Sequence, residues 1–364
     1  MRLADLPTPC LVLDRAILRA NIARMADALA RHGVPLRPHM KTAKSIDVAW
    51  LALAGQPGGI TVSTLLEAGY FAAHGIRDIL YAVGITPQKL DTVATLNARG
   101  AEVAVITDDL DAAAAIAAHP SPPRTLIEID TGEGRSGLGP GDDRLLALAE
   151  RLGTCLAGVM THAGHSYAAR SAAAIAAIAE AERAGAVRAA ERLRAAGHPA
   201  PIVSVGSSPT ALHAPSFGGV TEVRAGVYMF GDLFQAEIGT HGPDDIAVTV
   251  LASVIGRRPG QVLIDAGGLA LSKDRSTEAA PRDWGFGRVL DMAGRPLGET
   301  MVRRAYQEHG VVELDPRCPL DLAVGAKVRI APNHTCMTAA AHDRYHVVEG
   351  SDEVLAVWPR VNGW

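Results

Sequence analysis

The chain has few cysteines, few aromatic residues and no long apolar run. Its four cysteines are far apart and form no Cys-x-x-Cys pair, so the sequence of 364 residues predicts no disulfide framework. Aromatic residues make up 4%, and the net charge of −4 comes without a basic tail or stripe, which argues against nucleic-acid binding. No window reaches the run of about 18 apolar residues that spans a membrane. The N-terminus also lacks the apolar core of a signal peptide. We therefore expect a cytoplasmic protein with reduced thiols.

The first two thirds of the chain alternate between short apolar, β-branched runs and Ala-rich stretches with helical spacing. This alternation predicts an α/β fold, a (β/α)8 TIM-type barrel, with a doubly wound open sheet as the competing fold. The expected strands are Leu36–Met40, Ile60–Ser63, Ile79–Val83, Val103–Thr107, Thr125–Asp130, Leu156–His162, Ile202–Val205 and Glu222–Phe230. The expected helices include Arg15–Arg31, Ser45–Ala54, Pro87–Arg99, Asp109–Ala118 and Ala168–Ala196.

The last third of the chain has a different sequence pattern, in which Gly and Pro turns separate apolar runs and no strong helical periodicity occurs. It predicts a mostly β domain over residues 241–364, which the opening strand in residues 1–13 can join. The barrel domain is then residues 14–240. The strands expected in the β domain are Ile246–Arg257, Gln261–Asp265, Arg303–Leu314, Lys327–Ile330 and Glu353–Pro359.

Reactive residues recur at the ends of the predicted barrel strands, where barrel enzymes carry their chemistry. Lys41 follows the first strand, and a lysine there can form a Schiff base with an aldehyde cofactor if burial or nearby cations depress its pKa. Arg37 and His39 are candidates for those cations. A lysine in a strand-end loop can also be a plain solvated charge. His162 and His165 follow the sixth strand and are candidate proton-transfer groups.

Two further strand ends have features of a phosphate site or a cofactor pocket. Gly206 and Ser207 follow the seventh strand, where small residues and hydroxyls let the backbone approach a phosphate, although a plain turn is the alternative. Tyr228, at the eighth strand, can reach the same phosphate or be a core aromatic. The loop Asp130–Gly137 lacks the glycine spacing of a dinucleotide site, and it is better interpreted as placing Arg135 near a cofactor ring.

A His-x-Cys pair, His334 and Cys336, is the candidate metal site. On an extended or looped segment, side chains two residues apart can turn to one ion, and an imidazole with a thiolate favours zinc. Two ligands suit an open site completed by water and substrate. The alternative is that a buried cysteine lies beside a loop histidine and the two bind no metal. Two polar clusters, Tyr306–Gly310 and His342–Tyr345, could support this chemistry or form surface turns.

Taken together, the motifs resemble a known family. RPHMKT, EIDTGEGRSG, THAGHSY, VGSSPT, GVYMFGD, YQEHG and NHTCMTAAAHDRY occur in the order seen in fold-type III pyridoxal-phosphate enzymes of the D-serine dehydratase and D-threonine aldolase group. The resemblance covers essentially the whole chain. Ser208 stands where the family often has threonine, which keeps a hydroxyl. His-Thr-Cys is similar to the dehydratases, because the aldolases have a His-Cys-Asp run.

The resemblance implies an alanine-racemase-like barrel with a β domain, assembled as a homodimer. It implies that Lys41 carries pyridoxal phosphate, that Gly206, Ser207 and Tyr228 bind its phosphate, and that Arg135 and Tyr167 flank its ring. It makes His334 and Cys336 ligands of Zn²⁺, with Mn²⁺ or another divalent metal as alternatives. The implied reaction removes water from a D-3-hydroxyamino acid (D-serine, D-threonine or D-3-hydroxyaspartate) to give a keto acid and ammonia. An aldolase, a racemase and a non-catalytic pyridoxal-phosphate binding protein are the rival hypotheses.

Overall fold

In the computed structural model the chain divides into two compact units, and the structure describes residues 1–315, 317 and 322–364. The barrel unit comprises Arg24–Gly226 and Val361–Trp364, and the β unit comprises Met1–Ala23 and Val227–Arg360. Of the cysteines that the sequence predicts to be reduced, Cys10 and Cys155 are buried thiols outside any disulfide, and Cys318 lies outside the described residues.

Eight parallel strands build the wall of the barrel unit. They are β2 (Leu36–Pro38), β3 (Ile60–Val62), β4 (Asp78–Gly84), β5 (Glu102–Thr107), β6 (Thr125–Ile129), β7 (Leu156–Thr161), β8 (Ile202–Val205) and β9 (Glu222–Ala225). They pair in the order β2-β9-β8-β7-β6-β5-β4-β3. A parallel bridge from His39 to Thr61 joins the two outer strands and closes the ring. The predicted barrel is confirmed, because eight parallel strands pair in sequence around a closed ring.

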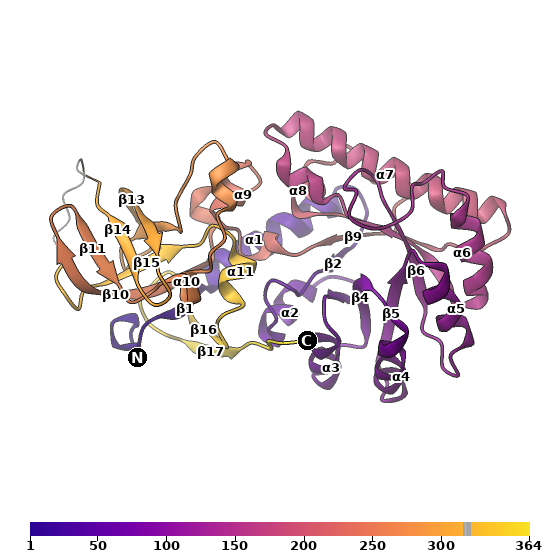
Figure 1. Cartoon of the computed structure of the whole chain (residues 1–364), viewed down its shortest axis with the longest axis horizontal. Helices are drawn as coiled ribbons and strands as arrows, with labels where there is room; N and C mark the ends of the chain where they lie inside the picture. The colour runs from indigo at the N-terminus through magenta and orange to yellow at the C-terminus, as the bar shows by residue number, and fades with distance from the viewer. Residues whose placement is uncertain (316, 318–321) are drawn as a thin grey trace. The chain divides into compact units, whose positions relative to one another are not determined.

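Helices cover the outside of the barrel strands (Figure 1). They are α2 (Ile46–Leu53), α3 (Leu65–Ala73), η2 (Pro87–Lys89), α4 (Leu90–Ala98), α5 (Leu110–Ala118), α6 (Arg144–Leu152), η3 (Gly153–Cys155), η4 (Gly164–Ala168), α7 (Ala172–Ala195) and α8 (Ser208–His213), while α1 (Arg15–Ala30) contributes to both units. The helices named from the sequence do not include α3 or α6. Among the described residues, no helix combines the length and the apolar character that a membrane crossing requires.

The last barrel strand is shorter than the predicted Glu222–Phe230. It ends at Ala225 because the next residue, Gly226, passes close to the His39 carbonyl: a Cβ at Gly226 would lie 2.9 Å from that oxygen. The chain then turns into η5 (Val227–Met229). Tyr228 therefore lies on a 3-10 turn in the β unit, and its predicted position on a barrel strand is wrong.

The β unit contains one nine-stranded sheet in the order β11-β14-β13-β12-β15-β10-β1-β16-β17. Its strands are β1 (Cys10–Asp14), β10 (Val248–Arg258), β11 (Gln261–Ile264), β12 (Arg288–Leu290), β13 (Pro296–Ala305), β14 (Gly310–Glu313), β15 (Lys327–Ala331), β16 (Arg344–Val348) and β17 (Ala356–Pro359). Its short helical segments are η1 (Leu3–Asp5), α9 (Leu233–Glu237), η6 (Pro243–Asp245), α10 (Gly268–Leu271), η7 (Ser276–Ala279) and α11 (Thr335–Ala339).

One predicted strand of this sheet is a hairpin in the structure. The predicted single strand Arg303–Leu314 is wrong: it is a hairpin of β13 and β14, and the Tyr306 amide donates to the His309 carbonyl across the turn at 2.8 Å. The Tyr306–Gly310 cluster is thus an exposed hairpin turn.

The N-terminal strand β1 lies between β10 and β16, and all five of its residues are buried.

The loop after β2 is held by contacts from two other parts of the barrel unit. The Lys44 Nζ forms an ion pair with the buried Glu67 at 3.1 Å, and the Val361 amide donates to the Lys44 carbonyl at 2.8 Å. Lys44 has φ 47°, a left-handed conformation that a residue with a side chain adopts at a cost. These contacts fix the loop that also contains Lys41.

Gly158 provides a test of how tightly the barrel wall is packed. It has φ 145°, and a Cβ there would overlap the Ile202 carbonyl of the neighbouring strand. Gly158→Ala is therefore expected to lower the free energy of unfolding by at least about 2 kcal/mol, measured by urea titration. Gly139→Ala is the matched control, because Gly139 is exposed with no atom within 4 Å of its added Cβ. Equal unfolding midpoints for the two variants would contradict the described wall.

Candidate active site and metal centre

The residues predicted at barrel strand ends gather at one edge of the barrel. Parallel strands place their carboxyl ends at the same edge of the barrel, so the loops after β2, β6, β7 and β8 meet there. These loops contain Lys41, Arg135, His162, His165, Tyr167, Gly206 and Ser207.

The Lys41 side chain is exposed at this edge. Its backbone amide donates to His39 Nδ1 at 3.4 Å, and its ammonium has no ion pair or hydrogen bond within the parts of the chain that the structure describes. The neighbouring Lys44 differs, because its ammonium is neutralised by Glu67. Lys41 is therefore the amine of this loop that is open to an aldehyde.

The two residues expected to act as cations beside Lys41 do not do so. Arg37 donates to Glu222 and to Asp78, each at 2.7 Å, and these partners lie at the amino ends of their strands. Burial, with Lys41 and Arg224 nearby, lowers the pKa of His39 well below its usual range, so His39 is neutral. The expectation is wrong for both, because strand alternation and burial decide which charges reach the barrel mouth.

His162 is held as a neutral imidazole. Its Nδ1 donates to the Gly206 carbonyl at 2.9 Å, which leaves Nε2 as the nitrogen with a lone pair. Burial lowers the pKa of His162 to about 3, and the charges of Lys41, Arg224 and Arg135 act in the same direction. Of these three cations, Lys41 is the one without a carboxylate partner among the described residues, whereas Arg135 pairs with Glu133. An anionic cofactor that carries an aldehyde, such as pyridoxal phosphate, fits this combination of charge and exposed amine.

Gly206 is required by the barrel itself. It has φ 130°, and a Cβ there would overlap the Arg224 carbonyl. Its amide donates to Glu182 Oε1 at 2.9 Å, so this N–H group is already engaged and leaves the neighbouring hydroxyl as the polar group for a phosphate. That hydroxyl, Ser207 Oγ, lies 2.9 Å from both Ser166 Oγ and Thr210 Oγ1.

The other predicted barrel residues are less enclosed. The Arg135 side chain is 57% exposed and forms an ion pair with Glu133 at 3.3 Å. His165 lies against Gly132, whose added Cβ would be 3.3 Å from His165 Nε2. The His165 Nδ1 is buried and has no hydrogen-bond partner among the described residues. Tyr167 is half-buried on η4, two residues after His165.

The predicted metal ligands form a separate centre within the β unit. His334 is the N-cap of α11, and Cys336 lies in its first turn, so the expectation of an extended or looped segment is wrong for Cys336. His334 Nδ1 lies 3.1 Å from Asp274 Oδ2. Burial lowers the pKa of His334, but the hydrogen bonds to Asp274 and Cys336 outweigh it and raise that pKa to about 11.

This donor set fits a divalent metal. Asp274 occupies His334 Nδ1 and so orients the ring with Nε2 available, as carboxylates commonly do for metal-binding histidines. No group of three or more histidine, cysteine, aspartate or glutamate side chains converges as a metal site in the described ranges. A pair of protein ligands leaves coordination positions for water and substrate, as an open catalytic site requires.

Other candidate positions lie elsewhere in the β unit. The Tyr228 carbonyl accepts a hydrogen bond from His241 Nε2 at 2.9 Å. His342 Nε2 donates to the Ala270 carbonyl, and Asp343 pairs with Arg344. Burial raises the pKa of Tyr345 to about 12, and Cys336 contributes to that shift.

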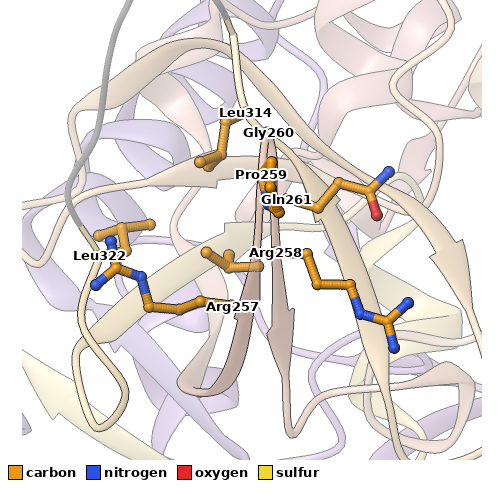
Figure 2. A pocket seen from close by; sticks show the side chains of 8 residues that line it. Arg257, Arg258, Pro259, Gly260, Gln261, Leu314 and Leu322 are labelled. Atoms are coloured by element: carbon orange, nitrogen blue, oxygen red, sulfur yellow. The ribbon is translucent and has the colours of Figure 1, made fainter.

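A pocket of about 420 Å³ lies at the turn between β10 and β11. Figure 2 shows the Arg257 and Arg258 side chains directed to opposite sides of this turn, so their charges do not converge on one ligand. None of the predicted catalytic, cofactor-binding or metal-binding residues lines this pocket. Its lining comprises Arg257, Arg258, Pro259, Gly260, Gln261, Val262, Leu314 and Leu322.

Sequence reasoning missed three charged residues at these two centres: Arg224, Glu182 and Asp274. Arg224 and Glu182 are buried in the barrel unit, and Asp274 is hydrogen-bonded to His334, one of the predicted metal ligands. A signal existed only for Glu182. It falls on the buried stripe of α7 with Ile175, Ala179, Ala186 and Leu193, although a lone glutamate in an Ala-rich helix is usually on a solvated face.

Comparison with known proteins agrees with both parts of the chain. The family model "Alanine racemase, N-terminal domain" matches residues 13–233, and "Putative serine dehydratase domain" matches residues 247–348. D-threo-3-hydroxyaspartate dehydratase of Delftia sp. is 45% identical over 100% of this chain and 99% of its own. Its solved structure superposes with a TM-score of 0.96 over 100% of both chains, at 44% identity. A cysteine-to-alanine variant of that enzyme has been solved in a metal-free form.

Two more distant relatives are named for different reactions, one a dehydratase and the other an aldolase. D-serine dehydratase of Dictyostelium discoideum is 30% identical, with 96% of this chain and 95% of the relative covered. D-threonine aldolase of Arthrobacter sp. is 31% identical, with 95% of this chain and 90% of the relative covered.

The neutral state of buried His162 predicts a pH dependence of stability. The unfolded chain binds a proton at an ordinary histidine pKa of 6.5, whereas folded His162 stays neutral down to about pH 3. Stability is therefore lost as the pH falls through this range, and the lowered pKa of His39 acts with the same sign. His162→Gln, which keeps a donor for Gly206, should flatten this loss by up to about 1.4 kcal/mol per pH unit. Urea unfolding at neutral and at mildly acidic pH measures it, and parallel curves for the two proteins would refute it.

Proposed function

The chain belongs to the fold-type III pyridoxal-phosphate enzymes of the D-serine dehydratase and D-threonine aldolase family, and from this premise we propose that it is a metal-dependent dehydratase of a D-3-hydroxyamino acid. The products would be a keto acid and ammonia. The observation that carries the proposal is the His334–Cys336 pair with Asp274 behind the imidazole, because this arrangement supports a metal site in addition to a pyridoxal-phosphate barrel.

Residues of the barrel mouth would hold the cofactor. The open amine of Lys41 would carry pyridoxal phosphate, and Ser207 would donate its hydroxyl to the phosphate, with Gly206 and Tyr228 as the other predicted phosphate residues. Arg135 and Tyr167 are proposed to flank the ring. When bound, the cofactor withdraws electrons from the substrate Cα and so makes its proton acidic.

Lys41 Nζ is the proposed base for the Cα proton. His162 and His165 are the two candidate histidines for the following proton transfers, and His162 is the one whose open nitrogen, Nε2, the hydrogen bond to Gly206 identifies. His165 stays the alternative. Because Gly206 holds Nδ1, His162 can exchange its proton only at Nε2.

His334 Nε2 and Cys336 Sγ would hold the metal, which we propose to be Zn²⁺ because an imidazole with a thiolate is a typical zinc donor set. A bound divalent ion supplies a Lewis acid that makes the β-hydroxyl a better leaving group. Asp274 keeps the imidazole in the tautomer that ligates through Nε2. Homodimer formation and a cytoplasmic location are further predictions for this chain.

D-threo-3-hydroxyaspartate is the first substrate to test, since the Delftia sp. enzyme named for it covers the whole chain at 45% identity. Aldol cleavage to glycine and an aldehyde is the second candidate, supported by the similarity to the Arthrobacter sp. aldolase. The two reactions differ at one point: elimination needs the β-hydroxyl to leave, whereas cleavage needs a base on it.

A panel of D-3-hydroxyaspartate, D-serine and D-threonine tests the proposal. We expect ammonia and a keto acid from at least one of them, loss of this activity in a chelator, and its return with added zinc. Enantiomeric L-substrates are the control and should not react. Glycine with an aldehyde as the only products would replace elimination by aldol cleavage, and activity that survives full removal of metal would refute the proposed role of His334 and Cys336.

Two variants separate the cofactor residue from the metal residue. Lys41→Ala should abolish the visible absorbance of lysine-bound cofactor and leave the metal content unchanged. Cys336→Ala should have the reverse effect, with bound metal reduced by at least about tenfold and the visible band retained. Absorbance spectra and elemental analysis of the same samples measure both. A visible band in Lys41→Ala, or full metal content in Cys336→Ala, would reject the respective assignment.

A further inference from the structure

Glu182 is a buried carboxylate that the proposed chemistry does not use. It lies on α7, with 1% of its surface exposed, far from the ends of the strands in sequence. Its Oε1 accepts two backbone hydrogen bonds, from the Ala163 amide and from the Gly206 amide, each at 2.9 Å. A third hydrogen bond joins its carboxylate to the Thr210 hydroxyl.

These hydrogen bonds reach both loops on which the barrel site depends. Ala163 directly follows His162, and Gly206 directly precedes Ser207. The peptides of Gly206 are held from two sides, because its amide donates to Glu182 and its carbonyl accepts from His162 Nδ1. Glu182 thus fixes the His162 ring through the backbone on each side of its hydrogen bond.

The same carboxylate sets the position of the proposed phosphate hydroxyl. Thr210 Oγ1 accepts from the Ser207 amide at 3.0 Å and lies 2.9 Å from Ser207 Oγ. Ser207 Oγ also lies 2.9 Å from Ser166 Oγ, next to His165 on η4. One helix residue therefore connects the loop after β7 to the loop after β8 without reaching the exposed edge itself.

We propose that Glu182 is a positioning residue that holds His162 and the phosphate loop at Gly206 and Ser207 in register with each other. This inference rests on the proposed function, because it assumes that Ser207 receives the cofactor phosphate and that His162 moves protons. Its effect is exerted through hydrogen-bond acceptance at Oε1. A glutamine keeps that oxygen at the same place, whereas a methionine of similar length has no acceptor.

The test compares Glu182→Met, Glu182→Gln and Glu180→Met in the full chain. Glu180 lies on the same helix with a side chain that is 45% exposed and paired with Arg183, so its substitution is a matched control. For each variant we would measure the affinities for pyridoxal phosphate and for pyridoxal, which lacks the phosphate, as well as kcat and KM on the active substrate. The ratio of the two affinities measures how much the loop at Gly206 and Ser207 contributes to binding the phosphate. A uniform loss of protein stability would not change this ratio.

Glu182→Met is expected to reduce the preference for pyridoxal phosphate over pyridoxal by about tenfold and kcat by about tenfold to a hundredfold. Glu182→Gln and Glu180→Met should stay close to wild type in both. If Glu182→Met does not fold, Glu182→Asp serves instead, because its shorter side chain cannot reach both amides, and the same losses are expected.

Two results would overturn the proposal. One is an unchanged affinity ratio and kcat in Glu182→Met or Glu182→Asp; the other is a loss in Glu182→Gln as large as that in Glu182→Met, since Oε1 acceptance would then not be the cause. A failure of the proposed function gives a different pattern. In that case the wild type binds pyridoxal phosphate, the affinity ratio still depends on Glu182, and no D-3-hydroxyamino acid is converted.

Discussion

A guanidinium buried inside the barrel constrains the residues around it. Arg224 is 3% exposed, and an unpaired charge at such a position would be strongly destabilising. It donates to Ser204 Oγ and to the Thr161 carbonyl, and Glu222 and Glu182 are among the carboxylates that compensate its charge. The inner wall of this barrel is therefore partly polar, and the charge of Arg224 is one of the causes that lower the pKa of His39 and His162 at its edge.

Strand ends and family motifs were readable from the sequence because they depend on local pattern. The apolar run Val103–Thr107 predicted β5 within one residue, and Lys41 followed its strand as expected. Asp274 and Glu182 could not be assigned, since their partners are distant in sequence and the contacts exist only in the folded chain. Tyr228 was misplaced because a close backbone contact at Gly226, invisible in the pattern, ends the strand early.

The two candidate sites share one arrangement, a carboxylate hydrogen-bonded behind a histidine that we propose to be functional. Asp274 orients His334 from the side opposite its free nitrogen, and Glu182 orients His162 through the peptide of Gly206. In each case the supporting carboxylate is less exposed to water than the functional group, so its hydrogen bonds are directional and hard to exchange for water. The orientation of both histidines is thus determined in part by residues outside the proposed catalytic and metal-binding sets.

The hydrogen bond from Val361 to the Lys44 carbonyl has a consequence for the order in which the protein is made. All eight barrel strands leave the ribosome before residue 361 does, so the barrel wall can assemble while the β unit is still being translated. The loop with Lys41 gains its final backbone contact only after β17 has emerged. Biosynthesis thus delays this tether of the Lys41 loop until the segment with His334 and Cys336 has already been synthesised.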